Sequence, residues 1–157
     1  MDLLAKLDVP FQFRRRPAPV PADLRPVWRI GLLLLMLLHS PGKKATLQKL
    51  HFVNSVCRSE KTRRLFLAYS SGAARKEEVL PRIEPSLNRA VNFARAEGLV
   101  DVENGRSLKL TDSGRELAQQ IEAMPDCLDE EKAFLETASP FLTEGKVEDL
   151  FTWNINL

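Results

Sequence analysis

Residues 99–110, LVDVENGRSLKL, decide the fold, because two short runs of alternating apolar and polar residues flank an Asn-Gly pair. Alternation with a period of two is typical of a β-strand that buries one face. Asn-Gly is the strongest short signal for a hairpin turn, because both residues tolerate a positive φ. The stretch therefore predicts a β-hairpin whose turn is formed by Asn104, Gly105 and Arg106.

The length of the turn sets the register of this hairpin. With a three-residue turn, the opposed pairs are Val102 with Leu108, Val100 with Leu110, and Asp101 with Lys109. The first two pairs place the apolar side chains on one face, and the third is a favourable pair of opposite charges. A two-residue turn mixes apolar and charged residues on each face, so we predict the three-residue turn.

Segments with apolar residues at helical spacing surround the hairpin. The predicted helices span about residues 25–39, 46–58, 61–69, 86–97, 112–124, 129–139 and 143–151. Apart from one additional helix before the hairpin, the order is helix, helix, helix, hairpin, helix, which is that of a winged helix-turn-helix. The expected fold is mainly α with a small β-hairpin wing, in the α+β class. We predict an extended arm at residues 1–22, a winged-helix domain at 23–124 and an acidic C-terminal helical extension at 125–157.

The composition of this 157-residue chain indicates the cellular compartment in which it works. Two cysteines in no motif, Cys57 and Cys127, favour a reducing environment. The apolar run IGLLLLMLL at residues 30–38 is about half of the roughly 20 residues that a membrane span needs, so it predicts a buried core helix. The first residues lack a signal-peptide pattern. We therefore expect a cytoplasmic protein without membrane contact.

The net charge of +2 hides a strong asymmetry. Residues 1–115 hold 21 Lys and Arg against 11 Asp and Glu, whereas residues 116–157 hold 2 against 10. The basic part favours an anionic partner such as nucleic acid. Alternatively, the basic and acidic parts attract each other within the molecule.

The N-terminal arm is the first candidate binding segment. Five prolines lie between residues 10 and 26, and they predict an extended, non-helical chain. Its candidate partner-binding residues are Phe11, Phe13, Arg14, Arg15 and Arg16. The arginines suit either phosphate groups or the acidic C-terminal part. We predict a contact with a partner, because proline holds the arm extended and presents it.

The predicted helix at residues 86–97 precedes the hairpin, which is the place of a recognition helix. It carries polar side chains that suit base edges, namely Asn88, Arg89, Asn92 and Arg95. The candidate nucleic-acid-binding residues of the whole chain are Lys43, Lys44, Arg89, Arg95 and Arg106. Contact with double-stranded DNA is therefore expected.

No motif in the sequence predicts catalysis. A phosphate-binding loop of the form Gly-x-x-x-x-Gly-Lys-Ser/Thr is missing, so this chain is not predicted to be an ATPase. His39 and His51 have no partner at metal-ligand spacing, and Cys57 continues an apolar stripe. The acidic run at residues 129–131 fits a solvated helix start better than a metal site. We expect no enzyme activity, no cofactor and no bound metal.

Three further stretches occur together in one known family: RPVWRIGL at residues 25–32, LQKLHFVN at 47–54 and EPSLNRA at 84–90. Over about residues 10–114 the chain resembles the middle component of bacterial ABC three-component systems, which include Lamassu-type anti-phage defence. The resemblance implies a winged-helix accessory subunit that accompanies an SMC-like ATPase. It also implies an effector subunit, often a nuclease.

The sequence thus favours a non-catalytic accessory subunit in antiviral defence, which contributes to assembly and to DNA contact. The alternative is a free-standing winged-helix DNA-binding transcriptional regulator. Against it, the polar row on the helix at 86–97 is modest, and the arm and acidic helices are unusual additions to a minimal regulator. A third interpretation is a structural interaction module that contacts no nucleic acid.

Overall fold

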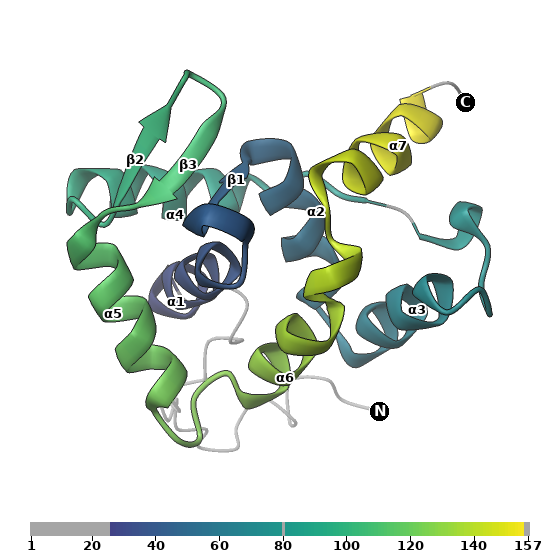
Figure 1. Ribbon diagram of the computed structural model, residues 1–157, viewed down its shortest axis with the longest axis horizontal. Coiled ribbons are helices and arrows are strands. Elements are labelled where there is room, and N and C mark those ends of the chain that lie inside the picture. Colours follow the sequence, from purple (N-terminus) through teal and green to yellow (C-terminus); the bar gives the residue numbers. More distant parts are fainter. Residues whose placement is uncertain (1–25, 80, 156–157) are drawn as a thin grey trace, which may run out of the picture.

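Helices form most of the fold, and three short strands form one antiparallel sheet (Figure 1). The computed structural model describes residues 26–79 and 81–155, with side chains described as far as Phe151. The helices are α1 (Pro26–Leu38), α2 (Leu47–Cys57), α3 (Glu60–Ser70), α4 (Pro85–Ala96), α5 (Asp112–Ala123), α6 (Asp129–Ala138) and α7 (Glu144–Ile155). The strands are β1 (Lys44–Thr46), β2 (Val100–Glu103) and β3 (Ser107–Leu110). The arm predicted at residues 1–22 lies outside the described residues.

Helix α1 is the centre of the core. The side chains from Leu32 to Leu37 are at most 2% exposed, because α2, α4, α5, α6 and the sheet all pack against this helix. A helix that is apolar all round is stable only when it is covered on all sides. The buried core helix predicted from the apolar run is therefore confirmed. Among the described residues, no helix has both the length and the apolar character to cross a bilayer.

The predicted hairpin is confirmed in its register. Val100 pairs with Leu110, Asp101 with Lys109, and Val102 with Leu108. The turn is formed by Asn104, Gly105 and Arg106, and the φ angles of Asn104 and Gly105, 55° and 68°, are in the left-handed region that this dipeptide tolerates. Leu108 and Leu110 are buried on the face toward the core, while Val102 near the tip stays 44% exposed.

Strand β1 was not predicted. Its three residues pair antiparallel with β3, Ala45 opposite Leu108, so the strand order in the sheet is β1-β3-β2. A strand this short between two helical segments shows no alternation long enough to detect in sequence. The side chain of Thr46 then caps α2 by accepting a hydrogen bond from the amide of Lys49. Strand and cap together fix the position of α2 beside the sheet.

The two C-terminal helices pack on the same core. Leu135 of α6 and Leu150 of α7 are at most 2% exposed and belong to the apolar cluster that contains α1. Phe134 meets Phe66 of α3 edge to face at 6.1 Å, and Phe151 meets Phe52 of α2 at 6.2 Å. Figure 1 shows α7 beside α2, and α6 below α2 on the side toward α3. The acidic helices thus cover apolar surface of the basic part of the chain.

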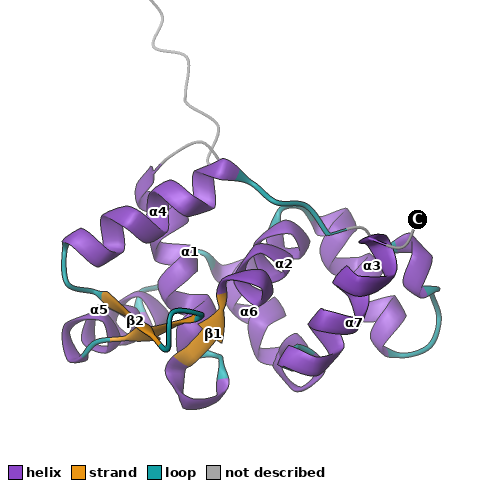
Figure 2. Ribbon diagram, turned by 90° about the horizontal axis from the view of Figure 1, so that it is seen from above, coloured by secondary structure: helices purple, strands orange, loops and turns teal. Residues whose placement is uncertain are grey.

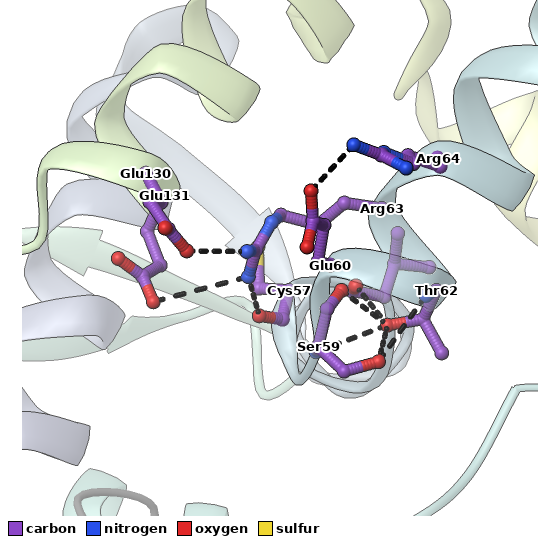
Figure 3. Close-up of polar contacts among 9 residues, drawn as sticks. Cys57, Ser59, Glu60, Thr62, Arg63, Arg64, Glu130 and Glu131 are labelled. Atoms are coloured by element: carbon purple, nitrogen blue, oxygen red, sulfur yellow. Dashed lines mark hydrogen bonds and ion pairs between the residues drawn. The ribbon is translucent and has the colours of Figure 1, made fainter.

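A buried arginine joins α3 to α6 (Figure 3). Arg63 is only 9% exposed, and its guanidinium donates to the carbonyl oxygen of Cys57 at 2.9 Å and to Glu130 at 2.6 Å. Glu131 lies 4.0 Å from the same group. This contact between a basic helix and an acidic one supports the view that the oppositely charged parts attract each other within the molecule.

We expect Arg63→Met to lower the free energy of unfolding by about 2 kcal/mol, because hydrogen bonds to a buried charged group are lost while the apolar stem is kept. Glu130→Gln should cost less than about 1 kcal/mol, because this carboxylate is mostly in water. Its side chain is 78% exposed. Urea unfolding of the two variants measures both losses, and a wild-type free energy of unfolding in Arg63→Met would show that Arg63 does not stabilise the contact between α3 and α6.

Candidate nucleic-acid interface

Helix α4 presents two different faces. One face is buried against the core and carries Leu87, Ala90, Val91 and Ala94, which recur at helical spacing. Asn88, Asn92 and Arg95 recur at intervals of four and three residues, so they form one exposed row. Figure 2 shows α4 running beside the sheet. The row lies on the side of α4 that faces the hairpin, because its three residues and the hairpin residues 105–108 line the same space.

A groove separates α4 from the hairpin, and we call it the α4–hairpin groove. It has a volume of about 410 Å³, and Asn88, Asn92 and Arg95 line one wall while Arg106 and Ser107 line the other. Among the ten residues that line it, two are arginines and none is acidic. Arginine and asparagine side chains form the bidentate hydrogen bonds that distinguish guanine and adenine edges. The groove thus gathers side chains that suit nucleic acid.

The other predicted DNA-binding residues lie elsewhere. Lys43 donates through Nζ to the carbonyl oxygen of Leu38 at 2.8 Å, and Lys44 Nζ lies 3.6 Å from a carboxylate oxygen of Glu103. Lys44 pairs with Lys109 of β3. Lys109 is next to Leu108, which lines the groove, and neighbouring residues of a strand point to opposite faces of the sheet. Lys44 therefore lies on the face of the sheet away from the groove. Arg89 is exposed on α4 but does not line the groove.

A carboxylate occupies the N-terminus of α2 next to this groove. Glu144 of α7 accepts hydrogen bonds from the amide of Thr46 at 3.1 Å and from its hydroxyl at 2.6 Å. Helix N-termini attract anions, because their amides are unpaired and the helix dipole is positive there. Arg106, Glu144 and Glu148 line a neighbouring hollow of about 330 Å³. A phosphate group at the start of α2 would therefore have to displace Glu144.

A polar network beneath α4 fixes where the helix begins. Arg29 of α1, 5% exposed, donates to Asn54 of α2 at 2.6 Å and lies 3.2 Å from Glu84, the residue before α4. Asn54 also donates to Glu84 at 3.3 Å, and Arg58 lies 3.5 Å from the other carboxylate oxygen. A buried charge is tolerated only when it is paired and hydrogen-bonded. The network therefore orients α4 relative to α1 and α2.

His51 of α2 contacts the row of exposed polar residues on α4 through Asn88. Its Nε2 lies 3.1 Å from Oδ1 of Asn88. Burial lowers the pKa of His51, while the hydrogen bond to Asn88 and the charge of Glu84 oppose this shift. The imidazole is therefore mainly neutral near pH 7, so it positions Asn88 without adding a cation beneath the groove.

The groups considered for catalysis are held in structural contacts. His39 contacts Glu122 at 3.1 Å. Cys57 is fully buried, and burial raises the pKa of its thiol, which makes it a poor nucleophile. In the described part of the chain, no group of three or more His, Cys, Asp or Glu residues has the geometry to hold a metal ion.

Comparison of the chain with protein families, with curated proteins and with solved structures gives no match.

Proposed function

We propose that this chain is a winged-helix subunit that contacts double-stranded DNA with the α4–hairpin groove. In this proposal α4 is the recognition helix and the hairpin of β2 and β3 is the wing. The observation that carries it is the groove itself, in which Asn92, Arg95 and Arg106 lie together without a carboxylate. The sheet order β1-β3-β2, with α4 directly before β2, also fits a winged helix, and α3 is then an insertion between the two helices of the helix-turn-helix.

The side chains of the groove suit phosphate groups and base edges. Its few cations and the nearby carboxylate of Glu144 make tight, sequence-selective DNA binding less favourable. Among the described residues that line the groove, two are arginines, and Glu144 occupies the N-terminus of α2, which would otherwise add a further phosphate contact. Specific recognition by a small domain generally needs several base contacts in addition to phosphate contacts. We therefore propose sequence-tolerant DNA contact, which suits a subunit of a larger assembly better than a free-standing regulator.

The assembly we propose is a complex with an SMC-like ABC ATPase and an effector subunit in bacterial anti-phage defence. Its support is the resemblance to the middle component of ABC three-component systems. The three stretches that carry this resemblance meet in one network, since each contributes one of Arg29, Asn54 and Glu84. These three residues position α4, the proposed recognition helix. The stretches that carry the resemblance therefore include the residues that hold the proposed DNA-contacting helix in place.

Removing the two groove arginines, Arg95→Ala with Arg106→Ala, should weaken DNA binding by more than about tenfold at low salt and reduce the slope of log K against log salt by about 1.8, because each phosphate contact contributes roughly 0.9. The control removes the same charge from α3, with Lys61→Ala and Arg64→Ala, and should leave the slope unchanged. Both control residues are exposed and lie away from the groove. Fluorescence anisotropy with duplexes of unrelated sequence measures both quantities.

The same titration distinguishes the candidate functions. Equal losses in the groove variant and the α3 variant would show that net charge, and not the groove, attracts DNA. An affinity that differs by several orders of magnitude between duplex sequences would favour the free-standing regulator. An absence of binding at low salt would leave the interaction module as the better description.

A further inference from the structure

A second groove lies on the opposite side of α4, and we call it the apolar groove. It has a volume of about 710 Å³, within the range of sites that enclose drug-sized ligands. The residues that line it include Trp28 of α1, Phe93 of α4, Ile121 of α5 and Met124, which directly follows α5. Phe93 is 52% exposed and Met124 is 50% exposed, so large apolar side chains face solvent here. The groove is thus concave and mainly apolar, which is the character of a site that binds apolar side chains.

The charge on the rim of the apolar groove restricts what it binds. Of the described residues that line it, Glu97 and Asp126 are acidic and none is Lys or Arg. A second copy of the same groove would bring carboxylates against carboxylates. A segment with aromatic side chains followed by cationic ones would be complementary to the groove. Its rings would pack on the apolar walls, and its cations would pair with the acidic residues of the rim.

We propose that residues 11–16 of this same chain, FQFRRR, occupy the apolar groove. Phe11 and Phe13 alternate with a polar residue, so in an extended segment both rings point to one side, toward the groove walls. Arg14, Arg15 and Arg16 follow directly and are complementary to the acidic rim. The proposal goes beyond the proposed function, and it assigns to the arm a site on its own domain in place of the partner contact predicted from the sequence.

The covalent connection makes this docking favourable. The arm precedes Val27, which itself lines the groove, so the chain reaches the domain at the edge of its site. The 13 residues from Arg14 to Pro26 span at most roughly 45 Å when extended, which leaves ample reach to turn back. Short tethers give effective concentrations of about 1 mM. A segment with a Kd of about 0.1 mM as a free peptide would therefore be docked in roughly nine chains of ten.

A thiol in the groove reports whether it is filled. Cys127 lines the apolar groove, and the other cysteine, Cys57, is fully buried. The rate at which a thiol reagent labels the native full-length protein therefore measures access to the groove. We expect Phe11→Ser with Phe13→Ser to raise the labelling rate of Cys127 about tenfold, since a docked fraction of roughly nine-tenths is lost. Phe141→Ser, which removes an exposed phenyl ring outside the groove, should leave the rate unchanged.

Reversing the charges of the arm and of the groove rim tests their pairing independently of the phenyl rings. Reversing the arginines, with Arg14→Glu, Arg15→Glu and Arg16→Glu, should also raise the labelling rate, and adding Glu97→Lys should lower it again. A free peptide of residues 8–18 should protect Cys127 in the Phe11→Ser, Phe13→Ser variant. These results together support the docked arm.

Equal labelling rates in the wild type, the phenylalanine variant and the charge-reversed variant would overturn the proposal. Protection that disappears on dilution, together with a dimer mass in light scattering, would also overturn it, because the arm would then fill the groove of a second copy. The DNA titration uses residues outside the apolar groove, so failure of the docked arm and failure of the DNA contact are distinguishable.

Discussion

Replacing Leu34 or Leu35 with aspartate is expected to unfold the protein. Both side chains are fully buried in α1, the helix against which α4, α5 and the sheet pack. An unpaired carboxylate in such a site costs several kcal/mol or becomes protonated at similar cost. Domains have a net stability of only about 5–15 kcal/mol, so one such substitution removes most of it.

The matched control for this prediction is Val27→Asp, an apolar-to-aspartate change in the same helix. Val27 is 81% exposed and lies in the first turn, where a negative charge is favourable. Circular dichroism should show cooperative melting for the control and little folded signal for the core variants. Wild-type melting of both core variants would contradict the central position of α1.

Gly114→Ala is expected to have the second largest effect. Gly114 lies in the first turn of α5, and a Cβ built there would lie 1.9 Å from the carbonyl oxygen of Leu99. This neighbour is backbone, and the same carbonyl accepts the amide of Thr111 at 3.1 Å. To accommodate the methyl group, α5 must move away from the strand that follows α4. Such overpacking costs about 2–3 kcal/mol, more than the gain of up to about 1 kcal/mol in helix propensity.

Gly145→Ala is the control, because it makes the same change in the first turn of α7. No atom lies within 4 Å of a Cβ at that position. It should be neutral or stabilise the protein by up to about 1 kcal/mol. In thermal melts, Gly114→Ala should lower Tm by roughly 5–10 °C and Gly145→Ala should not lower it. If the two variants melt alike, α5 does not approach Leu99 closely.

Local features of this fold were predictable from the sequence. The register of the hairpin followed from Asn104 and Gly105, because turn length and alternation act over a few residues. The buried face of α4 followed from its spacing. Strand β1 was missed, because it exists only through pairing with β3, about 60 residues away in the chain.

The candidate interface was only partly predictable, because long-range pairing decides which of its residues lie together. Arg95 and Arg106 do share a groove, but Lys44 lies on the other face of the sheet, a placement that only the missed strand decides. The network of Arg29, Asn54 and Glu84 joins residues 25 and 30 positions apart, and the contact of Glu144 with Thr46 spans 98 positions. No periodicity or turn signal records such contacts, because they depend on how complete helices pack.

Co-purification tests the central claim most directly. The full-length chain, tagged, is expressed together with an SMC-like ATPase encoded beside it, and the complex is isolated at physiological salt. We expect a stable complex of defined stoichiometry, with DNA contact that depends on Arg95 and Arg106 and varies little with duplex sequence. A chain that purifies without any neighbour-encoded protein and instead binds one promoter sequence tightly would contradict the account and identify a free-standing regulator.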